Sequence, residues 1–269
     1  MKYLPTLTIA GSDCSGGAGI QADIKTMSAL GCYAMSVITS ITAQNTCGVR
    51  AVLPLPVELV RSQLEAILED IPPLAIKIGM LYNSDIIHCV ASLLQECDIP
   101  LVIDPVMVAT SGDRLIDNTA VELFTRQLLP LSTLITPNLQ EAEVLSKTKM
   151  TSQHALEEAG QWFLSHGARA VLIKGGHTWE KEATDYLFHN DGCQTFTHSR
   201  IESPNTHGTG CTLSSAITAY LAQGQTLSQA VALGKLYLTE ALLSGKDLSI
   251  GHGHGPVDHF YNPQKSIKR

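Results

Sequence analysis

The 269-residue sequence lacks the patterns that mark several large classes of protein. No apolar run approaches the ~20 residues that a membrane-spanning helix needs. The net charge of −7 argues against a nucleic-acid binder, whose contact surface is basic, although local donors can still bind an anion. The seven cysteines are scattered without a Cys-x-x-Cys pair, so neither a disulfide framework nor a zinc site is indicated. A reducing cytoplasm is the expected setting.

Two nucleotide-binding patterns are also missing. The sequence contains no Walker A motif, and its glycine-rich stretch 11–19 lacks the Rossmann spacing. This stretch nevertheless lies between a strand-like and a helix-like run, where glycines such as Gly11 would let a ligand approach the backbone. A tight turn is the alternative. Asp23, one helical turn into the following segment, either points back at that ligand or is an ordinary solvated helix residue.

Apolar runs with the length of strands alternate with runs of helical periodicity. This alternation predicts an α/β protein whose sheet is mostly parallel, with helices on both faces. A turn at 190–192 predicts a β-hairpin, and 227–243 predicts a last helix with no strand after it. We expect one domain over 1–269, with a loose polar tail from Gln264. The expected strands are 7–10, 34–41, 75–78, 101–104, 134–136 and 170–174.

Polar side chains follow several of these strands, at the carboxyl edge where open parallel sheets bind ligands. Asp104 suits Mg²⁺ held through water, because Mg²⁺ prefers oxygen ligands and keeps several waters. Asn138 and Glu141, at the start of a helix, either contribute oxygens to the same hydrated ion or form a capping box. Lys174 either neutralises phosphate or extends from the sheet edge into solvent.

Two further segments carry polar residues without a decisive pattern. Residues 110–114 form a polar loop that either closes over phosphates, with Arg114 as a donor, or is a plain surface loop. His252 and His254 resemble a metal-binding tract, but two histidines without a third ligand favour a structural loop.

The most informative stretch is 205–212, in which a glycine turn is followed at once by an apolar face of helical spacing over 213–221. The turn therefore lies at a helix N-terminus, whose unpaired N–H groups and positive dipole favour phosphate. Cys211 at this turn is a core residue, a covalent nucleophile or a general base that takes a proton from a substrate hydroxyl. The glycines in front of it disfavour the core position.

Seven ordered blocks, which extend over nearly the whole chain from about residue 4 to Tyr261, resemble one known family. The blocks are 10–13, 16–23, 42–46, 77–81, 104–107, 136–142 and 206–216. They are similar to the bacterial hydroxymethylpyrimidine/phosphomethylpyrimidine kinases of the ribokinase superfamily. The resemblance implies a ribokinase-like three-layer α/β/α sandwich with a mostly parallel central sheet, usually assembled as a homodimer.

The same resemblance implies the reaction. MgATP phosphorylates the hydroxyl of 4-amino-5-hydroxymethyl-2-methylpyrimidine and then phosphorylates the monophosphate, in thiamine biosynthesis. It implies that Cys211 is the catalytic base, and that Gly208, Thr209 and Gly210 form the anion hole. Most sugar kinases of the superfamily carry aspartate where Cys211 stands. A thiol is the weaker base at neutral pH unless the helix N-terminus lowers its pKa.

The remaining site residues implied by the resemblance fall into three groups. The pyrimidine is held by Gly11, Asp23, Gln44, Met80 and Val106; the nucleotide by Asn138, Lys174 and Thr209; and Mg²⁺, through water, by Asp104 and Glu141. Gln44 suits a pyrimidine edge because a carboxamide both donates and accepts hydrogen bonds.

Three rival functions stay open at this stage. A pyridoxal kinase of the same branch acts on a similar hydroxymethyl group, although Gln44 and Met80 favour the pyrimidine. A non-catalytic pyrimidine sensor would bind without consuming ATP. A transferase with Cys211 as its covalent nucleophile is disfavoured, because no basic partner is evident in the sequence.

Overall fold

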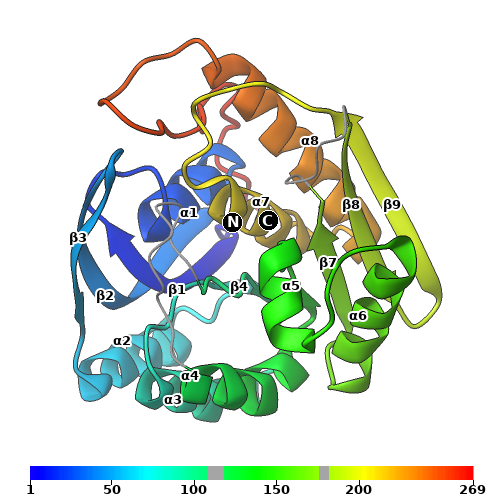
Figure 1. Ribbon diagram of the computed structural model, residues 1–269. Coiled ribbons are helices and arrows are strands. Elements are labelled where there is room, and N and C mark those ends of the chain that lie inside the picture. Colours follow the sequence, from blue (N-terminus) through cyan, green and yellow to red (C-terminus); the bar gives the residue numbers. More distant parts are fainter. Residues whose placement is uncertain (108–117, 176–181, 269) are drawn as a thin grey trace.

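A nine-stranded sheet crosses the part of the chain that the computed structural model describes, residues 1–107, 118–175 and 182–268 (Figure 1). The strand order is β3-β2-β1-β4-β5-β6-β7-β8-β9. The six inner strands from β2 to β7 are parallel, and β3, β8 and β9 are antiparallel to their neighbours. The strands are β1 (Pro5–Asp13), β2 (Tyr33–Asn45), β3 (Gly48–Pro54), β4 (Ala75–Ile78), β5 (Leu101–Ile103), β6 (Leu134–Ile135), β7 (Ala170–Lys174), β8 (Glu182–His189) and β9 (Gly192–Ser199).

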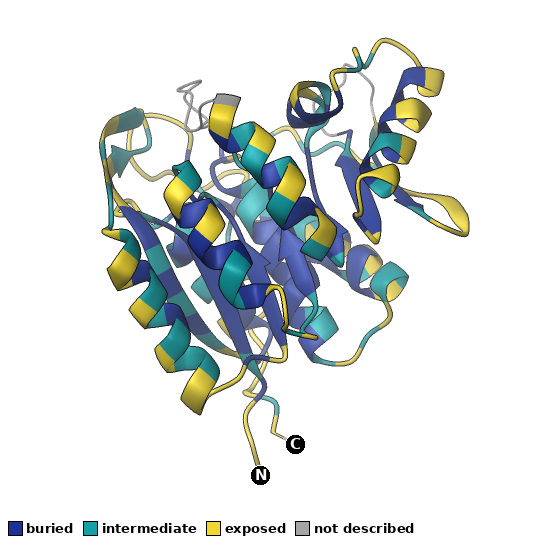
Figure 2. Ribbon diagram, turned by 90° about the horizontal axis from the view of Figure 1, so that it is seen from below, coloured by how far each residue is buried: buried dark blue, intermediate teal, exposed yellow. Residues whose placement is uncertain are grey.

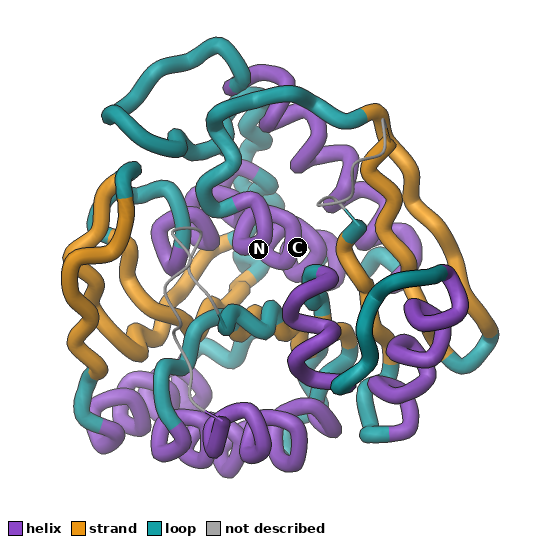
Figure 3. The backbone as a smooth tube through the Cα atoms, in the orientation of Figure 1, coloured by secondary structure: helices purple, strands orange, loops and turns teal. Residues whose placement is uncertain are grey.

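Helices cover both faces of the sheet, as the sequence pattern predicts (Figures 1 and 3). On one face α7 packs against both α1 and α8, and on the other α3 packs against both α2 and α4. The helix α4 continues into a π turn (Phe124–Leu128) and a 3-10 turn (Leu129–Leu131). The helices are α1 (Gly19–Ala29), α2 (Val57–Asp70), α3 (Ser84–Leu94), α4 (Asn118–Leu123), α5 (Leu139–Ser146), α6 (Gln153–Ser165), α7 (Thr209–Ala222) and α8 (Leu227–Gly245).

Successive strand residues supply two different cores, because neighbouring side chains in a strand point to opposite faces. Leu101 and Ile103 of β5 belong to the larger core, on the side of α2 and α3. Val102, between them, packs on the other face with Leu213 and Ile217 of α7. The strand β5 is therefore apolar on both faces, and the inner strands around it are largely buried (Figure 2), which is typical of parallel strands covered by helices.

Two expectations about the periphery are wrong. The strand β3 is missing from the predicted set, although it pairs with β2 through Ile41 and Leu53, both of which are exposed. The tail from Gln264 is docked, not loose: the backbone N–H groups of Gln264 and Ile267 donate to Ala29 and Gly31 over 2.7 and 2.9 Å. The two ends of the chain consequently lie side by side (Figure 2).

Within the described ranges, no helix is long and apolar enough to cross a membrane. The predicted hairpin is present as β8 and β9, and the predicted last helix is α8. The parallel strands end at one edge, next to the first turn of α7, and this edge carries the candidate site.

Candidate active site

A cavity of about 600 Å³ opens at the carboxyl ends of the parallel strands. Such a position follows from the topology, because loops after parallel strands converge beyond the sheet edge. Every site residue predicted from the sequence lines this cavity except Asp23. The lining residues predicted are Gly11, Gln44, Met80, Asp104, Val106, Asn138, Glu141, Lys174, Gly208, Thr209, Gly210 and Cys211.

The first turn of α7 forms one wall of the cavity, as predicted. Gly208 is the N-cap residue, with a left-handed φ of 78°, and no side chain caps the helix here. The N–H of Thr209 donates to the Thr206 carbonyl over 3.3 Å, so an anion would meet the N–H groups of Gly210 and Cys211. A Cβ atom at Gly210 would lie 3.2 Å from Asp104 Oδ2 and 3.4 Å from Lys174 Nζ, so this turn lies directly against that ion pair.

Replacing Gly208 by alanine should lower the free energy of unfolding by about 1–3 kcal/mol, because its φ is left-handed. The added methyl group would also meet the carbonyl oxygen of Gly17. Gly192 provides the control: its φ of 130° is also positive, but the space around it is open, so Gly192→Ala measures backbone strain alone. Urea denaturation compares the two variants. An equal loss in both would contradict a role for the contact with Gly17.

Cys211 faces the cavity from the first turn of α7. Burial raises the pKa of its thiol from 9.0 to about 11, although the positive charge of Lys77 acts in the opposite sense. In the free protein burial therefore outweighs any lowering of this pKa by the helix N-terminus. The resting form is the thiol. Cys211 can accept a proton only in the small fraction of molecules in which it is a thiolate, or after the charge around it changes.

Asp104 and Lys174 join the ends of β5 and β7. Lys174 Nζ lies 2.9 Å from Asp104 Oδ1, and both side chains are largely buried at the cavity wall. Burial alone would lower the pKa of Lys174, but the carboxylates of Asp104 and Glu141 outweigh it and raise that pKa. Lys174 is thus a fixed cation beside the helix N-terminus, rather than a side chain extended into solvent.

Asn138 and Glu141 form a complete capping box at the start of α5. Asn138 Oδ1 accepts from the Glu141 N–H over 2.9 Å, and Glu141 Oε2 accepts from the Asn138 N–H over 2.8 Å. Burial raises the pKa of Glu141 from 4.5 to about 7, and the nearby charge of Asp104 raises it further against the effect of Lys174. Both residues also line the cavity, so the capping box does not remove them from the site.

Asp23 lies beneath the cavity instead of on its wall. Its carboxylate accepts from the hydroxyls of Thr8 and Ser215, each over 2.6 Å, and pairs with Lys77 Nζ at 2.9 Å. Asp23 and Lys77 are both fully buried. Direct contact between Asp23 and a substrate, which the resemblance implied, therefore does not fit this structure, because its oxygens are already occupied.

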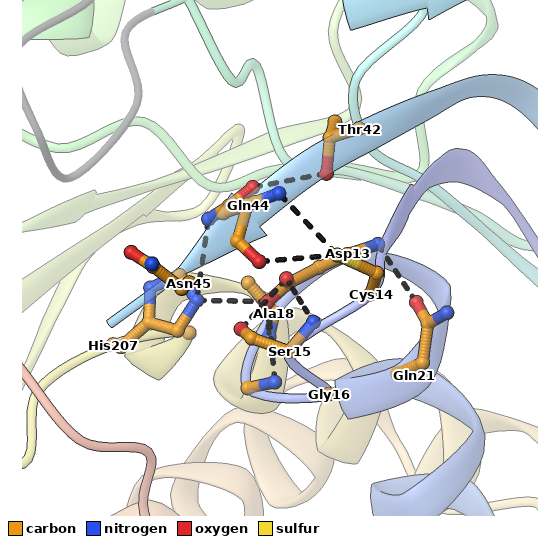
Figure 4. Close-up of polar contacts among 12 residues, drawn as sticks. Asp13, Cys14, Ser15, Gly16, Ala18, Gln21, Thr42, Gln44, Asn45 and His207 are labelled. Atoms are coloured by element: carbon orange, nitrogen blue, oxygen red, sulfur yellow. Dashed lines mark hydrogen bonds and ion pairs between the residues drawn. The ribbon is translucent and has the colours of Figure 1, made fainter. Parts of the chain in front are cut away.

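Another buried pair, between Asp13 and His207, also lines the cavity (Figure 4). His207 Nε2 lies 2.8 Å from Asp13 Oδ2. Burial alone would raise the pKa of Asp13, but hydrogen bonds from His207, Ser15 and Ala18 outweigh it and lower this pKa from 3.8 to about 2. The carboxylate of Asp13 thus joins the glycine-rich loop after β1 to the residue that precedes Gly208.

Sequence reasoning assigned no role to Lys77, Asp13 or His207. A lysine inside the apolar run 75–78 was the available signal for Lys77, because such a residue needs a buried partner. Asp13 and His207 lie inside recognised blocks, but nothing in their spacing pairs residues 194 positions apart.

Two of the remaining predictions have simple outcomes. Residues 110–114 lie outside the described residues. The backbone N–H groups of His252 and His254 donate to Thr46 Oγ1 and to the Thr46 carbonyl, which agrees with a structural loop. Among the described residues, no group of three or more His, Cys, Asp or Glu side chains is arranged to hold a metal ion.

Comparison with known proteins decides the family. A family model described as phosphomethylpyrimidine kinase matches residues 13–258. The chain belongs to this family. A hydroxymethylpyrimidine/phosphomethylpyrimidine kinase from Rhizobium meliloti (strain 1021) is 48% identical over 95% of this chain and 96% of its own length. Members of the family are phosphotransferases, and the chain is therefore an enzyme of this class.

Solved structures agree with the family and with the ribokinase-like fold. A crystal structure of phosphomethylpyrimidine kinase from Clostridium difficile 630 has a TM-score of 0.80 at 46% identity, and covers 89% of this chain and 99% of that one. A pyridoxal kinase from Staphylococcus aureus, in complex with AMP-PCP, has a TM-score of 0.89 at 34% identity, and covers 98% of this chain and 97% of that one.

Proposed function

We propose that this protein phosphorylates the hydroxyl of 4-amino-5-hydroxymethyl-2-methylpyrimidine with MgATP, and then phosphorylates the monophosphate, as a step of thiamine biosynthesis. The observation that carries the proposal is the position of Cys211 at an anion-binding helix N-terminus, in the same cavity as Gln44. Cys211 and the helix N-terminus suit phosphoryl transfer to a hydroxyl, and the carboxamide of Gln44 offers a donor and an acceptor to a pyrimidine edge. The relatives' names supply the substrate.

The chain's own groups account for the transfer. The pyrimidine lies against Gly11, Gln44, Met80 and Val106, with its hydroxyl near Cys211. The hydroxyl oxygen attacks the terminal phosphorus of ATP, and the thiolate of Cys211 takes the proton of that hydroxyl. The bond between this phosphorus and the oxygen that stays with ADP breaks. The N–H groups of the first turn of α7 stabilise the charge on the phosphoryl oxygens.

The residues around Asp104 fit a hydrated magnesium ion that arrives with the nucleotide. Asp104 and Glu141 supply only oxygen ligands, and Mg²⁺ in such sites uses one or two carboxylates together with phosphates and waters. Asn138, Lys174 and Thr209 line the same part of the cavity, where the ATP phosphates would lie. When bound, the ion neutralises charge on the phosphates during transfer.

A phosphate-transfer assay tests the proposal. Purified protein is incubated with MgATP and the hydroxymethylpyrimidine, and the mono- and diphosphate products are separated by chromatography. We expect the monophosphate to appear first and the diphosphate to follow. Phosphorylation of pyridoxal in preference to the pyrimidine would support the alternative indicated by the Staphylococcus aureus structure. Binding without any product would indicate a sensor.

Substituting Lys174 by methionine should raise KM for MgATP by about tenfold or more, because the cation beside the phosphate site is lost. KM for the pyrimidine should change little, since Gln44 and Met80 are unaltered. Lys149→Met is the matched control, because Lys149 is an exposed lysine paired only with Glu143. Initial-rate kinetics in both substrates measure the two constants. A rise confined to the pyrimidine KM would contradict this assignment of Lys174.

We also propose that the enzyme acts in the cytoplasm as a homodimer. The family resemblance supports both statements, and the unpaired cysteines are compatible with a reducing compartment. Sedimentation velocity at micromolar concentration tests the assembly, and a monomeric sedimentation coefficient would contradict the dimer.

A further inference from the structure

The carboxamide of Gln44 lies between two polar neighbours at the end of β2 (Figure 4). As drawn, Gln44 Oε1 lies 3.2 Å from Thr42 Oγ1 and Gln44 Nε2 lies 3.4 Å from His207 Nε2, but turning the amide by 180° exchanges these two atoms. The backbone of Gln44 is fixed independently, because its N–H and carbonyl both bond to Cys14 Sγ, over 3.3 and 3.0 Å. The open question is which end of the amide, oxygen or nitrogen, faces each neighbour.

Thr42 can only accept a hydrogen bond from Gln44. Its hydroxyl has one proton, and this proton is donated to the carbonyl oxygen of Ser12 over 2.9 Å. The amide of Gln44 is farther away, at 3.2 Å, and the Ser12 carbonyl cannot donate in return, so the proton goes to Ser12. The lone pairs of Thr42 Oγ1 can still accept a hydrogen bond, and the amide nitrogen of Gln44 is the group that can donate one.

His207 can only donate to Gln44. Its Nε2 lies 2.8 Å from Asp13 Oδ2, and Asp13 is an acceptor held by four further donors. These are the N–H and hydroxyl of Ser15 and the N–H groups of Gly17 and Ala18. An imidazole nitrogen facing such a carboxylate must carry its proton, and a ring nitrogen that carries a proton has no lone pair with which to accept from Gln44. The Nε2–H group of His207 therefore favours the amide oxygen of Gln44, and not the amide nitrogen, as its neighbour.

The two neighbours therefore demand the same orientation, with the amide nitrogen toward Thr42 and the amide oxygen toward His207. We infer that the pairs Asp13–His207 and Ser12–Thr42 are positioning pairs, which fix the carboxamide of Gln44 in one orientation and so set the order of donor and acceptor offered to the substrate. This inference rests on the proposed function, because it assumes that Gln44 meets the pyrimidine.

A fixed carboxamide discriminates between two kinds of heteroaromatic ring. A 4-aminopyrimidine presents an amino donor beside a ring-nitrogen acceptor, whereas a pyrimidin-4-one presents a carbonyl acceptor beside a ring N–H donor. A carboxamide that is free to turn by 180° pairs with either edge, whereas a carboxamide held at both ends pairs with one only. A ring with the wrong edge leaves polar groups unpaired in a buried site. The free-energy cost of these unpaired groups is the reason that such a ring is rejected strongly.

Neutron diffraction from crystals of the unliganded wild-type protein tests the orientation directly, since nitrogen, oxygen and deuterium are distinguished. We expect deuterium on the Gln44 atom facing Thr42 and on His207 Nε2, and none on the Gln44 atom facing His207. The opposite arrangement, or two orientations in comparable amounts, would overturn the inference. This test does not depend on any substrate.

Kinetics test the consequence. The quantity compared is the ratio of kcat/KM for the 4-amino substrate to that for 5-hydroxymethyl-2-methylpyrimidin-4-one. His207→Leu removes the N–H, and the ratio should fall by about tenfold or more, mainly through a higher KM for the amino compound. His207→Gln restores an N–H near the position of Nε2 and should keep the ratio within about threefold of wild type. An unchanged ratio in His207→Leu overturns the inference.

Two further variants keep the test decisive. Thr42→Val removes the acceptor at the other end of the amide and should lower the ratio in the same way, which covers the case of an unfolded His207→Leu. His88→Leu is the matched control, because His88 is an exposed histidine outside the cavity, and its ratio should equal that of wild type. If wild type phosphorylates neither pyrimidine, the proposed function fails, and the neutron result still decides the orientation.

Discussion

Replacing Cys211 by alanine should lower kcat by about 10²–10⁴-fold, the usual effect of removing a general base. KM for MgATP should stay near its wild-type value, because the N–H groups of the first turn of α7 and the Lys174 cation remain. Steady-state kinetics of the purified variant measure both constants. Cys193→Ala is the control, since Cys193 is an exposed thiol outside the cavity.

The pH dependence of the wild-type enzyme should show the raised pKa of Cys211. The active form is the thiolate and the pKa is about 11, so between pH 6 and 9 its fraction, and with it kcat/KM, should rise with pH. Cys211→Asp supplies a base that ionises at lower pH, so its profile should level off above pH 8, once Glu141 with its pKa of about 7 is also ionised. A Cys211→Ala variant with near-normal turnover, or a wild-type profile that falls with pH, would contradict the role of Cys211 as base.

Much of the fold follows from local sequence signals. The strands β4 and β7 match the predicted residues 75–78 and 170–174, because each is a short apolar run bounded by turn residues. The strand β3 could not be predicted in this way. Its residues Gly48–Pro54 are largely exposed, so no apolar alternation marks them, and the pairing with β2 is a tertiary property.

The site residues were predictable where they stand at the end of a strand or at the start of a helix. Asp104 and Lys174 follow strand ends, and Gly208 precedes a helix, so topology alone brings them together. Asp23 was misplaced because its environment depends on side chains from other strands. The register between β1 and β4 sets Thr8 opposite Lys77, and both reach Asp23. No pattern within α1 reveals that arrangement.

The buried pair of Asp23 and Lys77 yields the largest expected effect on stability. Lys77→Met should lower the free energy of unfolding by about 3–5 kcal/mol, because it leaves the carboxylate of Asp23 buried without its cation. Burial alone would lower the pKa of Lys77, but Asp23 outweighs it and raises this pKa, so the lysine is charged in the folded protein. Urea denaturation at pH 7 measures the loss.

Two comparisons separate this effect from a general loss of packing. Asp23→Asn combined with Lys77→Met removes the unpaired charge and should recover part of the stability, since an amide oxygen can still accept from Thr8 or Ser215. Arg61→Met breaks only exposed pairs with Glu58 and Glu65 and should cost less than about 1 kcal/mol. If Lys77→Met costs no more than Arg61→Met, the buried charge of Asp23 is not what Lys77 compensates.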